Sequence, residues 1–229
     1  TPHPSSLTPR PSPLTPMRIA LFGGSFDPVH NGHLAVAEAC LAAERVDRVW
    51  FVPAAVQPHK PRGPRATDTQ RTAMLRLAVA GRHACEVSTV EIDRGGASYT
   101  ADTLEQLHAA HPAHEWRLLM GADTLRDLPN WRRPGAILCM AAPLVVHRPG
   151  EPAPDFSPLA PLVAALGSGA AIPNADTSAD PNAAYAIVDM PPHDISSSQV
   201  RRRVAAGESI AGLVPPAVER YIREHGVYR

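Results

Sequence analysis

The sequence predicts an α/β fold with a doubly wound parallel sheet and a small helical part at the C-terminal end. Two observations lead to this prediction. Short apolar stretches alternate with helix-like stretches from residue 17 onward, and a glycine-rich turn follows the first apolar stretch. With 229 residues and 44% hydrophobic content, the chain is long enough to bury one sizeable core. Strands that alternate with helices form a parallel sheet through right-handed crossovers.

Six strands and six helices are expected, in alternating order along most of the chain. The strands are predicted at Arg18–Phe22, Arg48–Val52, Ala84–Asp93, Trp116–Met120, Leu144–His147 and Tyr185–Met190. The first helices are predicted at Asn31–Arg45, Thr67–Ala80, Tyr99–Ala110 and, more briefly, Leu159–Leu166. Thr67 and Gln70 fit a capping box at the start of the second helix. Two more helices close the chain within residues 195–229, and the last begins at Pro215 and Pro216.

Two segments differ from this pattern in composition. Residues 1–16 hold six prolines and few groups that could pack, so this tail is expected to be disordered. A mis-assigned start or an added leader explains the tail better than a functional arm or a transit peptide. Residues 17–229 are expected to form one domain, in which the Pro-, Ala-, Gly- and Ser-rich residues 150–184 are a variable low-complexity insertion.

Charge and cysteine content exclude several classes of function. Lys plus Arg and Asp plus Glu both total 22, so no net field exists to attract nucleic acid or an anionic membrane. Cys40, Cys85 and Cys139 lie far apart in apolar stretches, which suits reduced, buried thiols and no metal site. No apolar run reaches the ~18 residues of a membrane span. The chain is therefore predicted to be cytoplasmic. The sequence leaves open whether it forms a homo-oligomer.

The turn after the first predicted strand has the sequence Gly-Gly-Ser-Phe-Asp-Pro-Val-His-Asn-Gly-His, residues 23–33. In a parallel sheet, ligands bind at the carboxyl ends of the strands. A helix that starts there offers free N–H groups to a phosphate. Gly23 and Gly24 allow the close backbone approach that a side chain would block. This turn is therefore predicted to bind phosphate.

Two histidines open the helix that follows. His30 and His33 are three residues apart, so both can face one phosphate group, and Gly32 between them keeps the approach open. Most His-x-x-His pairs are solvated or structural, but the glycine turn and the strand before it favour a phosphate site here. A zinc site would need a third ligand, and no fitting group lies nearby in the sequence.

A second phosphate motif is predicted after the last strand. Ile195–Arg201 reads Ile-Ser-Ser-Ser-Gln-Val-Arg at the start of a predicted helix. Serines there can cap the helix, and Arg201 can hold an anion with two parallel hydrogen bonds. Taken alone, the segment also fits an ordinary capped helix with a basic face.

Together these motifs resemble the nucleotidylyltransferase superfamily, whose signature is His-x-Gly-His. The form in residues 23–33 is similar to that of bacterial nicotinate-mononucleotide adenylyltransferases, and the resemblance spans residues 17–229 apart from the insertion. It implies a Rossmann-like fold. It also implies transfer of the adenylyl group of ATP to nicotinate mononucleotide, giving nicotinate adenine dinucleotide and pyrophosphate in NAD biosynthesis.

The resemblance also implies roles for individual residues. The catalytic group comprises His30, His33, Ser198 and Arg201. The residues expected to bind ATP are Gly23, Gly24, Ser25, Phe26, Gly32, Gly121, Asp123, Arg148 and Ser197. Those expected to bind nicotinate mononucleotide are Lys60, Ser98, Tyr99, Thr100 and Trp131, with the tryptophan stacked on the pyridine ring.

The reaction that these residues suit is in-line attack of a mononucleotide phosphate on the α-phosphorus of ATP. A phosphate monoester has its second pKa at about 6, so this nucleophile is ionised at neutral pH and no general base is needed. Positioning and neutralisation of phosphate charge then supply the catalysis. Mg²⁺ is expected to arrive with ATP, because the sequence shows no cage of carboxylates for it.

Other functions would also fit parts of this sequence. The same chemistry on nicotinamide mononucleotide, phosphopantetheine or a cytidylyl-type substrate is the nearest alternative, although phosphopantetheine enzymes typically carry Thr where this chain has His30. A class I aminoacyl-tRNA synthetase would need a longer chain and a Lys-Met-Ser-Lys-Ser-like loop. An ATP-binding sensor with a retired active site would keep the same motifs. His108, His111 and His114 are expected to be solvent-exposed and without a ligand, because Pro112 interrupts the helix.

Overall fold

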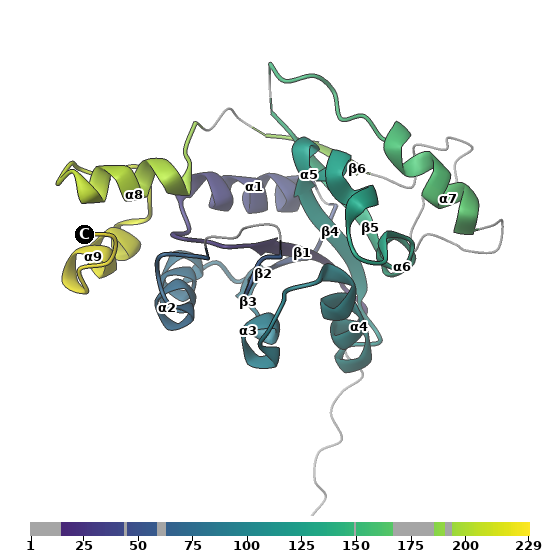
Figure 1. Cartoon of the computed structure of the whole chain (residues 1–229), viewed down its shortest axis with the longest axis horizontal. Coiled ribbons are helices and arrows are strands. Elements are labelled where there is room, and N and C mark those ends of the chain that lie inside the picture. Colours follow the sequence, from purple (N-terminus) through teal and green to yellow (C-terminus); the bar gives the residue numbers. More distant parts are fainter. Residues whose placement is uncertain (1–14, 44, 59–62, 149, 167–185, 191–193) are drawn as a thin grey trace, which may run out of the picture.

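The computed structural model describes residues 15–43, 45–58, 63–148, 150–166, 186–190 and 194–229. Six parallel strands form one sheet in the order β3-β2-β1-β4-β5-β6, with helices on both faces (Figure 1). The strands are β1 Arg18–Gly24, β2 Arg48–Pro53, β3 Cys85–Val87, β4 Glu115–Gly121, β5 Ala141–His147 and β6 Ala186–Asp189. The prediction of a doubly wound, Rossmann-like α/β fold is confirmed.

The helices connect the strands and close the chain. The described α-helices are α1 Asn31–Ala42, α2 Asp68–Val79, α3 Val90–Arg94, α4 Thr100–Ala110, α5 Ala122–Asp127, α6 Pro134–Met140, α7 Ala160–Leu166, α8 Ser197–Ala205 and α9 Pro216–Glu224. Two 3₁₀ turns, Leu128–Asn130 and Ser157–Leu159, follow α5 and precede α7. The last two helices form the predicted C-terminal part.

Two hydrophobic clusters cover the two faces of the sheet, because successive strand residues point to opposite sides. One cluster joins Ala20 and Phe51 to buried residues of α1, α2, α8 and α9. The other joins Leu21 and Val52 to buried residues of α4, α5 and α6. β1 pairs with β2 on one side and β4 on the other, so the strand order reverses beside it. The carboxyl end of β1 is therefore the expected ligand crevice.

Most predicted element boundaries agree with the structure. The capping box of α2 is present, since the Thr67 hydroxyl accepts from the Gln70 amide and the Gln70 side chain accepts from the Thr67 amide. The strand predicted for Ala84–Asp93 is wrong in its second half. Only Cys85–Val87 forms the edge strand, and the chain then turns into α3, where the Thr89 hydroxyl donates to Asp93.

Several other predictions are corrected or fall outside the described residues. Cys139 is exposed, not buried, because its neighbours Ile137 and Leu138 take the inward-facing positions of α6. Most of the predicted tail, residues 1–14, and about half of the predicted insertion, residues 167–184, lie outside the part that the structure describes. Within the described part, no helix is both long and apolar enough to cross a membrane.

Candidate active site

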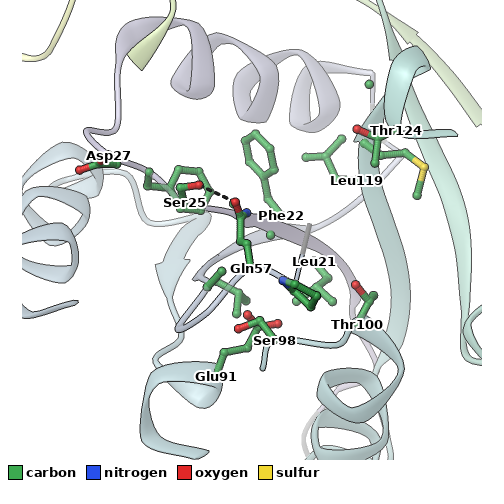
Figure 2. Close-up of a pocket in the computed structure, with 18 of the residues that line it drawn as sticks. Leu21, Phe22, Ser25, Asp27, Gln57, Glu91, Ser98, Thr100, Leu119 and Thr124 are labelled. Carbon is green, nitrogen blue, oxygen red and sulfur yellow. Dashed lines mark hydrogen bonds between the residues drawn. The ribbon is translucent and has the colours of Figure 1, made fainter. Parts of the chain in front are cut away.

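A cavity of about 710 Å³ opens at the carboxyl ends of β1 and β4. The turn after β1, the starts of α4 and α8, and the segment around Trp131 line it. Figure 2 shows Ser25, Ser98, Thr100 and Thr124 around this space, coming from both halves of the sheet. The cavity is large enough for a small-molecule ligand, and its lining mixes apolar surface with a few polar groups.

The histidines that begin α1 are fixed relative to each other. The backbone N–H of His30 donates to Nδ1 of His33 at 3.2 Å, and the two rings stack with centroids 3.7 Å apart. With Nδ1 accepting, a neutral His33 carries its proton on Nε2. His33 lines the cavity, whereas His30 is buried behind it.

Both histidines are held in the neutral form. Burial lowers the pKa of His30 to about 4, and the nearby charge of Arg148 adds to this. Burial also holds the pKa of His33 well below its ordinary value, with smaller contributions from His30 and Arg148. At neutral pH the pair therefore offers uncharged N–H donors, and an arriving anion would favour protonation.

The glycines of the motif have different roles. A Cβ on Gly32 would lie 3.0 Å from Nδ1 of His30 and 3.6 Å from the carbonyl oxygen of Ile195, so a side chain there would displace the histidine. A Cβ on Gly24 would lie 3.1 Å from the Phe26 ring. Gly23 lines the cavity and faces open space, so it leaves the backbone accessible.

A network of hydrogen bonds holds the turn between β1 and α1. Arg71 is completely buried and donates to the carbonyl oxygens of Ser25 and Ala54, both at 2.6 Å. Asp27 is buried and accepts from the backbone N–H groups of Arg65 at 2.8 Å and Ala66 at 3.0 Å. The conformation of the turn that was predicted to bind phosphate is thus set by contacts with the segment before α2 and with α2 itself.

The start of α8 lies against the same turn. Ser197 Oγ donates to the carbonyl oxygen of Pro28 at 2.9 Å, and Arg201 Nη1 donates to the carbonyl oxygen of Asp27 at 2.6 Å. Arg201 Nη2 donates to Ser198 Oγ at 3.0 Å. Ser197, Ser198 and Arg201 all line the cavity. The two motifs predicted to bind phosphate therefore meet at one site, although they are more than 160 residues apart.

The opposite wall of the cavity is aromatic and polar. Tyr99 precedes the first residue of α4, Thr100, and both line the cavity with Ser98 and Trp131. Ser98 Oγ accepts from the Ala55 amide at 2.9 Å, which holds this segment against the end of β2. The guanidinium of Arg132 lies 4.6 Å above the Tyr99 ring. A flat heterocycle could stack at this end of the cavity.

The remaining predicted residues fall into three groups. Gly121 and Asp123 line the cavity at the end of β4 and the start of α5. Arg148 does not line it, is exposed, and lies 3.6 Å from Glu151, although its charge reaches both histidines. Lys60 lies outside the described residues.

Sequence reasoning missed several residues that line the cavity. Gln57 accepts a hydrogen bond from Ser25 Oγ at 2.8 Å (Figure 2). Glu91 is buried and accepts from Thr103 Oγ1 at 2.7 Å. Asp127 and Arg132 also line the cavity. Arg132 directly follows Trp131, a predicted site residue, so its place in the sequence could have indicated it. No local sequence pattern marks Gln57 or Glu91 as a site residue.

The prediction that the other three histidines are solvent-exposed is wrong. His114 is buried, and His108 and His111 are half-buried at the amino-terminal end of the sheet. The His111 ring lies edge-on to Trp50 with centroids 5.1 Å apart, and His108 hydrogen-bonds the carbonyl oxygen of Met140 at 2.9 Å. Pro112 does lie just beyond the end of α4, but the His111 ring packs near Trp50 and Trp116, and the His108 ring near Trp116. Among the described residues, no group of three or more His, Cys, Asp or Glu side chains could hold a metal ion.

Comparison with known proteins agrees with this geometry. Residues 21–203 match the family model described as cytidylyltransferase-like. A relative from Geobacter sp. strain M21, named "Probable nicotinate-nucleotide adenylyltransferase", is 40% identical over 93% of this chain and 98% of its own. A relative of the same name from Roseiflexus sp. strain RS-1 is 43% identical over 92% of this chain and 98% of its own. The chain belongs to the nicotinate-nucleotide adenylyltransferases of the cytidylyltransferase-like family.

Solved structures share the fold of this adenylyltransferase. The nicotinic acid mononucleotide adenylyltransferase of Plasmodium falciparum, complexed with NaAD, gives a TM-score of 0.69 at 19% identity and covers 92% of this chain and 97% of its own. The same enzyme complexed with APC gives 0.68 at 18% identity, with coverages of 93% and 97%. These structures show the same fold, and the relatives of about 40% identity confirm the resemblance inferred from residues 23–33 and 195–201 at the level of the family.

Proposed function

We propose that this chain transfers the adenylyl group of ATP to nicotinate mononucleotide, giving nicotinate adenine dinucleotide and pyrophosphate for NAD biosynthesis. The observation that supports this best is one continuous cavity. His33, Ser198 and Arg201 lie at one part of it, and Tyr99 and Trp131 lie at another. Such a cavity suits two nucleotides that meet at their phosphates.

The chemistry requires one bond to form and one to break. A phosphate oxygen of the mononucleotide attacks the α-phosphorus of ATP, and the bond between that phosphorus and the bridging oxygen of pyrophosphate breaks. We assign His33 Nε2–H to a phosphate oxygen at the reacting centre, with His30 beside it. Ser198 and Arg201 are assigned to the pyrophosphate that leaves. Fixed donors of this kind stabilise charge that grows in the transition state.

The other residues are assigned by their place in the cavity. Gly23, Gly24, Ser25 and Phe26 form the wall at the carboxyl end of β1, and Gly32 leaves the space that the His30 ring occupies. Gly121, Asp123 and Ser197 are assigned to ATP, and Ser98, Tyr99, Thr100 and Trp131 to nicotinate mononucleotide. For Arg148 and Lys60, roles at the two nucleotides stay predictions from the sequence.

Magnesium is proposed to enter as part of the substrate. Mg²⁺ prefers phosphate oxygens and water to a cage of protein ligands, so it would bind ATP and arrive with it. The ion would neutralise charge on the phosphates as pyrophosphate leaves. A cytoplasmic location and a homo-oligomer likewise remain predictions.

The choice of acid over amide is supported by positive charge near the aromatic wall. Arg132 stacks over Tyr99 and lines the cavity, although Asp102 lies 3.3 Å from its Nη1. The amide groups at the start of α4 add a second source of positive potential. A carboxylate on the pyridine ring would be attracted by both, whereas the neutral amide of nicotinamide mononucleotide would gain less.

Pyrophosphate release tests the proposal directly. Purified protein with Mg²⁺ and ATP is offered nicotinate mononucleotide and nicotinamide mononucleotide in parallel reactions. We expect a kcat/KM at least tenfold higher for the acid. A preference for the amide would reassign the acceptor. ATP binding with no turnover of either mononucleotide would favour an ATP-binding sensor.

A further inference from the structure

Tyr228 reaches the active-site turn from the C-terminal segment. Its hydroxyl donates to Oδ1 of Asp27 at 2.8 Å, and its ring is 9% exposed. The backbone φ of Tyr228 is 71°, in the left-handed region that a bulky residue rarely occupies. Tyr228 does not line the cavity. The contact therefore needs an explanation other than binding of substrate.

The segment that carries Tyr228 is held firmly. Val218 and Ile222 of α9 and Val227 beyond it are buried in the same cluster as Met74 and Leu75 of α2. The backbone N–H of Val227 donates to the carbonyl oxygen of Ile222 at 3.1 Å, which closes the end of the helix. These contacts fix the position of the tyrosine hydroxyl independently of the loop that it meets.

Asp27 connects this hydroxyl to the phosphate motif of α8. Its Oδ1 accepts from Tyr228 and from the Ala66 amide, and its Oδ2 accepts from the Arg65 amide. Oδ2 also lies 3.6 Å from Nη1 of Arg201. The same Nη1 donates to the Asp27 carbonyl oxygen at 2.6 Å. Both the side chain and the backbone of Asp27 thus determine where the guanidinium sits.

The Tyr228 hydroxyl is well suited to act as a hydrogen-bond donor in a fixed position. Burial, followed by the charge of Asp27 and the hydrogen bond to it, raises the pKa of Tyr228 far above its ordinary value. The group therefore stays protonated at every pH at which the enzyme would work. A hydrogen bond to a buried carboxylate is stronger than one between neutral groups.

We propose that Tyr228 is a positioning residue for the pyrophosphate end of the active site. Through Asp27, its hydroxyl fixes the orientation of Arg201, which then meets the phosphates of ATP. This inference rests on the proposed function, because it assigns Arg201 to the nucleotide. It adds a residue from the C-terminal segment that no local motif connects with the chemistry.

The first test compares Tyr228→Phe with Tyr221→Phe. Both variants lose one hydroxyl from the C-terminal segment, but the Tyr221 ring stacks on His225 and has no contact with Asp27 among the bonds described. We expect Tyr228→Phe to lower kcat about tenfold, as loss of one hydrogen bond to a charged group would. The KM for nicotinate mononucleotide should stay close to that of the parent, and the melting temperature should fall by several degrees because one buried hydrogen bond is lost. Tyr221→Phe should match the parent in all three.

The second test separates positioning from a purely structural role. Tyr228→Phe is introduced into an Arg201→Lys background, in which the oriented guanidinium is already gone. If Tyr228 acts through Arg201, the second substitution lowers kcat less than twofold there, against about tenfold in the parent. Equal loss in both backgrounds, or equal kinetics for Tyr228→Phe and Tyr221→Phe, would overturn the proposal.

Affinity for Mg·ATP is measured by calorimetry on the parent, Tyr228→Phe, Arg201→Lys and the double variant. This measurement does not depend on the acceptor. We expect Tyr228→Phe to weaken binding about threefold in the parent and not in the Arg201→Lys background. A parent that binds Mg·ATP but uses neither mononucleotide would refute the proposed function alone. The binding cycle would still decide the role of Tyr228, and additive losses of affinity would refute that role.

Discussion

Two groups of histidines lie at opposite ends of the sheet. His30 and His33 stand at the carboxyl end, where β1 meets α1. His111 and His114 lie at the amino-terminal end, just before β4, where their rings stack with centroids 5.8 Å apart. The first pair adjoins a cavity of about 710 Å³, whereas the second packs beside Trp50 and Trp116.

Burial and the direction of the pKa shift do not distinguish His30 from His114. His30 and His114 are both 7% exposed. Burial lowers the pKa of both, and it also lowers that of His33. What differs is the position relative to the strands, because only the carboxyl end offers a helix N-terminus beside a cavity. A perturbed histidine is therefore a sign of a site only when a ligand could reach it.

The largest effect expected from this comparison is that of His33→Ala. Loss of a fixed donor to the reacting phosphate should lower kcat about 10³-fold with little change in KM. His114→Ala is the matched control, because it removes a buried histidine from the other end and should leave kcat unchanged. Steady-state rates of pyrophosphate release check both. Equal kcat for His33→Ala and the parent would contradict the assignment of the site.

Acid should destabilise the protein through His30. Its pKa is about 4 when folded and 6.5 in the unfolded chain, so the unfolded state binds more protons between these values. The contribution of His30 to the free energy of unfolding is therefore fully present above pH 6.5 and is lost, by at most about 3 kcal/mol, as the pH drops to about 4. Protonation of His33, whose pKa is also lowered by burial, destabilises the fold in the same direction. Urea unfolding without nucleotide at pH 7, 5.5 and 4.5 measures this.

The variant His30→Gln should lose the part of that pH dependence that comes from His30 and keep the part that comes from His33. His114→Gln should lose less, because the shift in the pKa of His114 is in the same direction but smaller. An unchanged slope in His30→Gln would show that the acid sensitivity comes from another group.

Trp131→Ala should affect one substrate only. Loss of stacking on the pyridine ring would raise the KM for nicotinate mononucleotide about tenfold and leave the KM for ATP unchanged. Trp50→Phe, at the other end of the sheet, is the control and should change neither value. Initial rates at varied concentrations of each substrate check this. A rise in both KM values for Trp131→Ala would indicate general damage to the cavity.

The smallest effect is expected at the amino-terminal end. His108→Ala removes the hydrogen bond from α4 to the carbonyl oxygen of Met140 at the end of α6. The free energy of unfolding should fall by about 1 kcal/mol, with no change in kcat or KM. Chemical unfolding and steady-state kinetics measure these quantities. A change in KM would mean that this end of the sheet is energetically coupled to the cavity.

Patterns within a few residues could be predicted from the sequence. The capping box at Thr67, the turn at residues 23–33 and the proline-led start of α9 each depend on neighbours in the chain. The turn and the start of α8 each follow a predicted strand, and their meeting agrees with the rule that ligands bind at the carboxyl ends of parallel strands. Local rules thus gave most of the fold and both phosphate motifs.

Contacts across the chain could not be predicted in this way. Pro112 correctly indicated the end of α4, but nothing local showed that Trp50 and Trp116 would cover the histidines beside it. Glu91 was placed in a strand, although it lies in α3 and lines the cavity. The bond between Tyr228 and Asp27 joins residues 201 positions apart. Such contacts depend on how whole elements pack, which a single sequence does not display.

The pairing of β1 with β4 also determines when an active site can exist during folding. Arg18 pairs with Glu115, so the centre of the sheet closes a loop of nearly half the chain. Pairing over such a distance is slow, because the entropy of loop closure is lost before the stabilising contacts form. Because both halves line the cavity, a half-assembled sheet has no place for a nucleotide. Nucleotides should therefore slow unfolding and leave the rate of refolding unchanged.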